Sequence, residues 1–255
     1  MKIFSWNVNG LRSTEKEFIK FIKTKKPDIL MIQELRAYPD QLSFFLKSIP
    51  NYKVLFNPAD RPGYSGTAIY YKNSIKFEKV SSVTSDEILN LEGRTIYCRI
   101  GDLYIFNFYT PNGTSSEERL KFKLDFYSHI LNLIRGLINK NKSVIIGGDL
   151  NVAATELDLY APKKNLNHSG FLESERKWFT DMLKLGFIDT FRMFEKEGGH
   201  YTWWHMRDPE RKKNHGWRFD YFLVSKKLKN KVKSSRILKN VFGSDHCPIM
   251  LDIDI

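Results

Sequence analysis

The sequence predicts one α/β domain over residues 1–255, built as a four-layered sandwich of two mixed β-sheets packed face to face with helices outside. Three observations predict it. Apolar runs of strand length recur along the whole chain, and amphipathic helical patterns lie between some of them. The two halves share an order of strand, helix and strand, and no linker or low-complexity tract separates them. Such elements bury their apolar faces best as packed layers.

The expected strands are rich in β-branched and aromatic residues, which suit a pleated, packed surface. Each is bounded by Gly, Pro, Asn or Asp, the residues typical of turns. In chain order they are residues 2–6, 28–33, 52–56, 67–71, 94–100, 103–109, 143–148, 217–224 and 248–254.

Three segments carry helical patterns. Thr14 and Glu17 have the spacing of a capping box, and Phe18, Phe21 and Ile22 follow them. The second segment has apolar residues at steps of four and three, namely Leu120, Leu124, Tyr127, Leu131, Ile134 and Ile138. The third extends from about Glu173 to Leu185, and Gly186 suits its C-terminal cap. Its expected apolar face is Trp178, Phe179, Met182 and Leu183.

The composition narrows the class of protein. The formal net charge of +12 indicates a polyanionic partner, most commonly nucleic acid, although a Lys-rich surface also serves solubility. No apolar run approaches the roughly 18 residues of a membrane span. The N-terminus lacks the apolar region of a signal peptide, so we expect a cytoplasmic protein without membrane contact. Cys98 and Cys247 lack the spacing of a zinc site, and we expect both to be buried and reduced.

Polar residues that a core would not choose stand just beyond several expected strands. They are Asn7, Asn9, Glu34, Tyr109, Asn112, Asp149, Asn151, Asp245 and His246. Because ligand sites gather where strand ends open into loops, we expect these side chains to meet at one edge. Asp220, inside an apolar run, would join them, and the four carboxylates would repel one another without a cation. Hard oxygen ligands favour Mg²⁺ over zinc.

Each of these residues also has a simpler interpretation on its own. Glu34 suits a cap or a surface position, Asp149 and Asn151 suit an Asx turn, and Asp245 and His246 suit a turn. Asp220 is harder to explain that way, because a carboxylate among apolar residues needs a partner, and His246 would supply it. The coincidence of all these positions favours a site.

Seven segments, in order, resemble the motif series of the exodeoxyribonuclease III family of abasic-site (AP) endonucleases. They are IFSWNVNGLR, PDILMIQELR, GYSGTAIYY, FYTPNG, IIGGDLNVA, GWRFDYFLVS and GSDHCPI, and they span residues 3 to 250. The wider fold group includes DNase I-like nucleases, sphingomyelinases and inositol phosphatases. GYSG and GWRFDYF indicate the DNA-repair branch of that group.

The resemblance implies a DNase I-like fold and a monomer that hydrolyses the DNA backbone 5′ to abasic sites. It also implies 3′→5′ exonuclease and 3′-phosphodiesterase or phosphatase activities, with Mg²⁺ as cofactor and Mn²⁺ as a substitute. The partner would be double-stranded DNA with abasic or 3′-blocked lesions. Nicking at other damaged nucleotides and hydrolysis of non-DNA phosphoesters by the same fold stay as alternatives. The third alternative is a DNA-binding protein with an inactive site, although the full set of acidic residues and His246 argues against it.

The resemblance further implies roles for single residues. The catalytic set is Tyr109, Asp149, Asn151, Asp220 and His246. The set at the metal is Asn7, Asn9, Glu34, Asp149, Asn151, Asp245 and His246. The set at the DNA and its lesion is Arg94, Asn112, Asn165, Trp203, Arg207, Trp217 and Phe219. Asp149 would activate the attacking water or manage the proton of the leaving group.

Two positions depart from the family pattern. Asn9 stands where some members carry Asp, which would weaken metal affinity, and His168 stands where Asn is common.

Basic residues also cluster in loops near tryptophans, at Lys163, Lys164, Arg207 and 211–213. This pattern suits binding of a nucleic-acid backbone with stacking on Trp203, Trp204 and Trp217, although solvated loops and core tryptophans are the simpler interpretation. We expect the Lys-rich run 226–240 to be a solvated edge.

Overall fold

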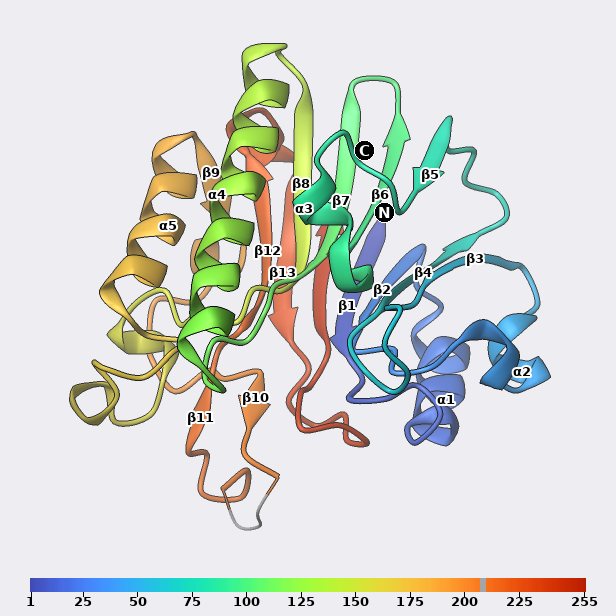
Figure 1. The fold of residues 1–255 in the computed structure, drawn as a ribbon. Coiled ribbons are helices and arrows are strands. Elements are labelled where there is room, and N and C mark those ends of the chain that lie inside the picture. Colours follow the sequence, from blue (N-terminus) through green and yellow to red (C-terminus); the bar gives the residue numbers. More distant parts are fainter. Residues whose placement is uncertain (207–209) are drawn as a thin grey trace.

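The computed structural model describes residues 1–206 and 210–255. Two six-stranded mixed sheets face each other, and helices cover both outer faces (Figure 1). The predicted α/β sandwich is confirmed. Arg207, expected at the DNA, lies outside the described residues.

The first sheet has the strand order β13-β14-β1-β2-β4-β3. Its strands are β1 (Lys2–Asn7), β2 (Ile29–Gln33), β3 (Tyr52–Asn57), β4 (Thr67–Lys72), β13 (Val232–Ile237) and β14 (Ile249–Ile253). β1 and β2 are parallel, and helix α1 (Glu15–Lys25) connects them; the other pairings are antiparallel. β13 lies within the Lys-rich run 226–240 and forms the sheet edge, as expected of a solvated edge.

The second sheet has the order β5-β6-β7-β8-β12-β9 and repeats this plan. Its strands are β5 (Lys79–Ser81), β6 (Thr95–Ile100), β7 (Leu103–Tyr109), β8 (Ser143–Asp149), β9 (Phe187–Asp189) and β12 (Asp220–Ser225). Here β7 and β8 are the parallel pair, connected by helix α4 (Glu117–Asn139).

A small hairpin of β10 (Trp203–Trp204) and β11 (Gly216–Trp217) projects beyond the sheets (Figure 1). The run predicted as one strand over 217–224 is therefore split between β11 and β12. Strands β5, β9 and β10 were not predicted, because two or three residues are too few to show an alternating pattern. The six-residue strand β13 was not predicted either, because it lies in the Lys-rich run 226–240, which has few apolar residues.

The remaining helices are α2 (Phe44–Lys47), α3 (Glu87–Asn90) and α5 (Glu173–Lys184). Short 3₁₀ turns are η1 (Pro39–Gln41), η2 (Leu91–Gly93), η3 (Glu156–Asp158), η4 (Pro162–Lys164), η5 (Phe191–Met193) and η6 (Lys226–Lys231). All three predicted helices are present as α1, α4 and α5, and Gly186 follows α5 with φ of +93° as expected of a C-terminal glycine.

Two details of the helix predictions are wrong. The Thr14 hydroxyl does not cap α1; it donates to the carbonyls of Val8 (2.8 Å) and Gly243 (3.0 Å), tying the helix start to two loops. Leu183 is 40% exposed, because α5 presents Trp178, Phe179 and Met182 to the core instead.

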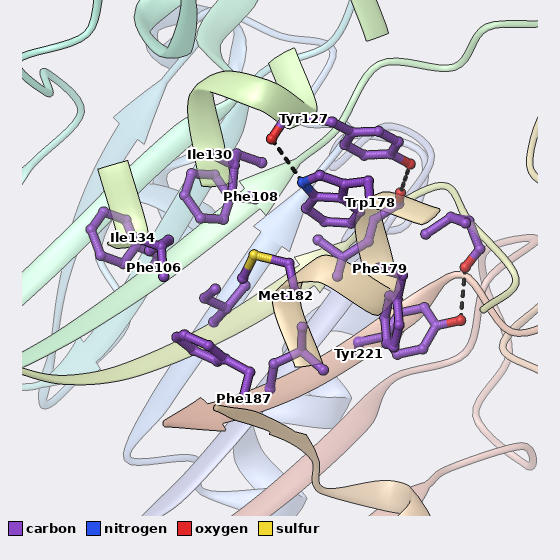
Figure 2. Close-up of a cluster of buried hydrophobic side chains, with 14 of the residues drawn as sticks. Phe106, Phe108, Tyr127, Ile130, Ile134, Trp178, Phe179, Met182, Phe187 and Tyr221 are labelled. Carbon is purple, nitrogen blue, oxygen red and sulfur yellow. Dashed lines mark hydrogen bonds between the residues drawn. The ribbon is translucent and has the colours of Figure 1, made fainter. Parts of the chain in front are cut away.

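Three apolar clusters hold the layers together. One fills the space between the sheets, and a second lies between α1 and the first sheet. The third packs α4 and α5 on the second sheet, with Trp178 stacked on Tyr127 at 4.0 Å between ring centroids (Figure 2). Cys98 and Cys247 are buried and unpaired with each other, as predicted. Among the described residues, no helix has the length and apolarity to cross a membrane.

Candidate active site

The candidate site is a groove of about 660 Å³ at the strand ends of both sheets. Thirteen of the predicted residues line it: Asn7, Glu34, Arg94, Tyr109, Asn112, Asp149, Asn151, Asn165, Trp203, Trp217, Phe219, Asp245 and His246. Asp220 lies behind His246, and Asn9 lines a neighbouring cavity that shares Asp245 and His205 with the groove. The structure thus brings together segments from both halves of the chain.

Two glycines bring the second sheet into position under the groove. A Cβ on Gly147 would lie 2.7 Å from the Met31 sulfur, which belongs to the opposite sheet. Gly148 has φ of +136°, and a Cβ there would lie 1.9 Å from the Phe108 carbonyl oxygen. Only glycine fits at these places, so the pair allows β8 to deliver Asp149 at the strand end.

A buried row of three ionisable groups forms the floor of the groove. The His246 Nδ1 lies 2.8 Å from Asp220 Oδ2, and its Nε2 lies 3.8 Å from Asp149 Oδ2. Burial lowers the pKa of His246, but the carboxylates of Asp220 and Asp149 raise it more, so the net shift is upward. The imidazole is therefore held as a cation that compensates two buried carboxylates.

Asp149 is also held by amides. Its Oδ2 accepts from Asn7 Nδ2 at 2.9 Å and from Asn151 Nδ2 at 3.4 Å, and its Oδ1 accepts from the Asn151 backbone N–H at 2.9 Å. Burial raises the pKa of Asp149, and His246 opposes the shift without cancelling it. A carboxylate with a raised pKa and fixed orientation is suited to accept a proton near neutral pH.

Tyr109 presents a neutral phenol to the groove. Burial raises its pKa well above the ordinary value, and the nearby Glu34 raises it further. Arg94 supports it from behind: the guanidinium lies 4.6 Å from the ring centroid and donates to the Tyr109 carbonyl at 3.1 Å. Arg94 is only 2% exposed and is also paired with Glu92 at 2.7 Å, so its contacts are with the protein.

Three of the four predicted carboxylates, Glu34, Asp149 and Asp245, line the groove, and the fourth, Asp220, lies behind His246. No three His, Cys, Asp or Glu side chains among residues 1–206 and 210–255 are arranged to hold a metal ion. Asp149 and Asp220 face His246, whereas Glu34 and Asp245 line the groove separately. The His246 imidazole thus lies between the carboxylates of Asp149 and Asp220, which leaves Glu34 and Asp245 to face the groove.

Glu34 and Asp245 have protein donors but also face the groove. Glu34 is paired with Arg36, and Asp245 accepts from Trp203 Nε1 at 3.0 Å and from the Ser244 hydroxyl at 3.1 Å. The Asn9 amide contacts Met206 Sδ at 3.4 Å and so points into the neighbouring cavity.

Three aromatic rings form one wall beside His246. Phe219 lies 5.5 Å from Trp203 and 5.3 Å from Trp217, measured between ring centroids. Trp203 and Trp217 are paired across the β10–β11 hairpin, and Trp203 is bridged to the His246 backbone. The fourth aromatic, Trp204, is 3% exposed and belongs to the core, as the simpler interpretation held.

Of the basic residues expected in DNA-binding loops, Arg211 is bound to the protein, whereas the lysines are exposed. Arg211 is bound to another loop: it donates to the carbonyls of Ser244, Lys239 and Val241, and its guanidinium lies 4.6 Å from the Trp204 ring centroid. Lys163, Lys164, Lys212 and Lys213 are exposed. Asn112 holds the Thr114 backbone, and Asn165 donates to the carbonyl of Ala161 at 3.0 Å.

The sequence analysis missed several residues at the site. Tyr64 and Arg119 line the groove, and Arg119 pairs with Glu92 at 2.7 Å. Lys123 reaches the site from α4 without exposure to solvent. The available signal for Lys123 was a lysine within the apolar stripe of a helix.

The comparisons with known proteins agree with this geometry. The model of the Endonuclease/Exonuclease/phosphatase family matches residues 4–246. An exodeoxyribonuclease of Bacillus subtilis is 38% identical over the full length of both chains. A DNA-(apurinic or apyrimidinic site) endonuclease of Dictyostelium discoideum is also 38% identical, over 100% of this chain and 71% of that protein.

Solved structures show the same relationship. An AP endonuclease from Archaeoglobus fulgidus superposes with a TM-score of 0.89 at 27% identity, and a 3′-5′ exonuclease from Neisseria meningitidis with 0.85 at 26%. Each comparison covers all of both chains. The sequence match, the fold and the groove together show that this chain is a nuclease of the endonuclease/exonuclease/phosphatase family.

Proposed function

We propose that the protein hydrolyses the DNA backbone 5′ to abasic sites. The observation that carries this proposal is the juxtaposition of the buried row Asp149, His246 and Asp220 with the wall of Trp203, Trp217 and Phe219. The first group suits hydrolysis of a phosphodiester, and the second suits a base-free sugar.

In this mechanism His246, held by Asp220, binds a non-bridging oxygen of the scissile phosphate as a cation. Asp149 takes the proton of the water as its oxygen bonds to phosphorus, while the Asn151 and Asn7 amides hold the carboxylate in place. The bond from phosphorus to the 3′ oxygen of the preceding sugar breaks, and that oxygen takes a proton from solvent. The neutral phenol of Tyr109 donates a hydrogen bond to the phosphate. In-line attack needs these groups to be fixed before substrate binds, and their burial provides that.

Nucleases of this family depend on a metal, generally Mg²⁺. The donors present fit it, because Mg²⁺ is often held by one or two carboxylates together with water and substrate phosphate. Glu34 and Asp245 line the groove outside the row of Asp149, His246 and Asp220, and they would hold the ion. Bound there, it would neutralise charge on the phosphate.

We expect EDTA to abolish nicking of an abasic duplex and added Mg²⁺ or Mn²⁺ to restore it. Glu34→Gln should raise the metal concentration needed for half-maximal rate, because it removes a ligand charge. Glu78→Gln, in an exposed ion pair with Arg99, is the matched control and should behave as wild type. Undiminished activity in EDTA would contradict metal dependence.

The aromatic wall accounts for lesion preference. Extruding a nucleotide costs about a few kcal/mol, and least where the base is missing. A site closed by Phe219 and Trp217 also leaves little room for a base. An intact nucleotide is therefore disfavoured twice, without any hydrogen bond to a base.

We expect Phe219→Ala or Trp217→Ala to reduce abasic cleavage and to lower the ratio of abasic to undamaged cleavage. The control is Trp204→Ala, which removes a core tryptophan from the same hairpin and should lower Tm without changing that ratio. If Phe219→Ala also lowers Tm with a constant ratio, the wall is core and the lesion assignment is wrong.

A second activity has its own support. The Neisseria neighbours include a 3′-5′ exonuclease and a 3′ phosphatase bound to product DNA hairpin. We therefore propose that the same groove also accepts blocked 3′ ends. Duplexes with an internal abasic site, a 3′-phosphate or no lesion separate these activities, and a phospholipid substrate tests the non-DNA alternative.

A further inference from the structure

Lys123, in the second turn of α4, is completely buried, which is rare for a lysine. Its ammonium donates to Glu175 Oε1 at 2.6 Å, to the Asn151 carbonyl at 2.7 Å and to the Ser169 hydroxyl at 3.4 Å. The three contacts use all three of its donors. Glu175 is also fully buried, and a buried ion pair often stabilises no more than apolar residues of similar volume. Stability alone therefore does not explain the pair.

The Lys123 side of the pair holds the catalytic loop, residues 149–153, which carries Asp149 and Asn151. Three successive carbonyls of this loop accept from buried side chains: Leu150 from the Tyr127 hydroxyl at 2.6 Å, Asn151 from Lys123, and Val152 from the Tyr221 hydroxyl at 2.7 Å. Tyr127 and Tyr221 lie in the cluster under α4 and α5 (Figure 2). Asn151 itself has φ of +47°, a conformation that persists only where its surroundings enforce it.

The Glu175 side of the pair holds a second loop, residues 168–172, which lies behind the aromatic wall. Glu175 Oε1 accepts from the Ser169 hydroxyl at 2.8 Å, and Oε2 accepts from the backbone N–H groups of Gly170 (2.6 Å) and Leu172 (2.9 Å). Gly170 lies against the wall so closely that a Cβ there would meet the Phe219 ring at 3.1 Å. Its carbonyl also accepts from the Ala153 N–H at 2.7 Å.

We infer that the Lys123–Glu175 pair positions Asn151 relative to the aromatic wall. One buried ion pair then fixes both the groups that attack the phosphate and the wall that contacts the lesion. Both are positioning residues: neither lines the groove, and they act through Asn151 and Gly170. The effect on cleavage rests on the proposed function, whereas the effect on the two loops does not.

The test uses two variants of the full chain. Lys123→Met removes the donor to Asn151 and leaves Glu175 charged and unpaired. The double variant Lys123→Met/Glu175→Gln leaves no buried charge and keeps an acceptor for the Gly170 and Leu172 amides. Ile134→Ala is the control, because Ile134 lies on the same helix and is fully buried, but its apolar side chain cannot form a hydrogen bond or ion pair with either loop.

We expect kcat on an abasic duplex to fall on the order of 10- to 100-fold in both variants, with KM little changed. Tm should fall in Lys123→Met and largely recover in the double variant, while kcat stays low. Hydrogen exchange should quicken at residues 149–153 and 168–172 in both. Ile134→Ala should lower Tm with kcat and loop exchange unchanged.

Recovery of kcat together with Tm in the double variant would overturn the inference, as would unchanged exchange at both loops. An inactive wild-type protein would instead contradict the proposed function. The exchange measurement then still decides the inference, because it needs no substrate.

Discussion

Asp149→Asn and His246→Asn should each lower the single-turnover rate of abasic cleavage by at least about 10²-fold, the loss typical of a catalytic acid or base. Asp149→Asn removes the proton acceptor, and His246→Asn removes the cation that faces the phosphate. Each variant removes at most one of the contacts that hold the DNA backbone, so Kd for uncleaved abasic duplex should change little.

His129→Asn is the matched control for this experiment. His129 Nδ1 also lies 2.7 Å from a carboxylate, that of Asp86, but the pair is outside the groove and His129 is 39% exposed. This variant should keep the wild-type rate. A near-normal single-turnover rate in Asp149→Asn or His246→Asn would refute the role given to that residue.

Arg218→Met should destabilise the protein by roughly 3–5 kcal/mol, the cost of leaving buried charges unpaired. Arg218 is 1% exposed and donates to Asp158 Oδ1 at 2.8 Å and to Asp189 Oδ2 at 2.7 Å. Asp158 is fully buried, and in the variant Arg192 is its one remaining ionic partner among residues 1–206 and 210–255. For a chain of this size the loss corresponds to a drop in Tm on the order of 10 °C.

The comparison is Arg99→Met, which breaks an exposed ion pair with Glu78 and should cost at most about 1 kcal/mol. Urea unfolding measures the loss of stability in the two variants. Burial raises the pKa of Asp158, but Arg218 and Arg192 lower it more, so its stabilising contribution is present at neutral pH and is lost as the pH falls through the acid range. Equal losses in the two variants would show that the Arg218 pairs contribute no more than surface charges.

The Arg218 pairs also bear on the groove, because Arg218 stands between Trp217 and Phe219. Its backbone N–H donates to the Asp158 carbonyl at 2.7 Å, and its own carbonyl accepts from the Tyr221 hydroxyl at 2.9 Å. Loss of the ion pairs should therefore loosen the aromatic wall as well as destabilise the fold.

The local pattern of the sequence determined the sandwich and most of the groove. Long apolar runs with turn residues at their ends show strands, and four-and-three spacing shows helices, because each depends only on neighbouring residues. The polar residues that follow or precede the apolar runs lie at strand ends, because the position of a strand end is also visible in neighbouring residues. The partnership of Asp220 with His246 followed from the need of a buried carboxylate for a partner.

Only the tertiary structure decided where those side chains point and what neutralises them. Asn9 follows the same strand as Asn7 but turns into another cavity, and Arg211 is bound by carbonyls of a distant loop. Imidazolium compensates Asp149 and Asp220, because packing of β8 against β12 and the 243–246 turn brings the three together. Lys123 faces the core because α4 lies over the Asn151 loop. These contacts join segments far apart in the chain, and their partners depend on the packing of the layers, which no local pattern encodes.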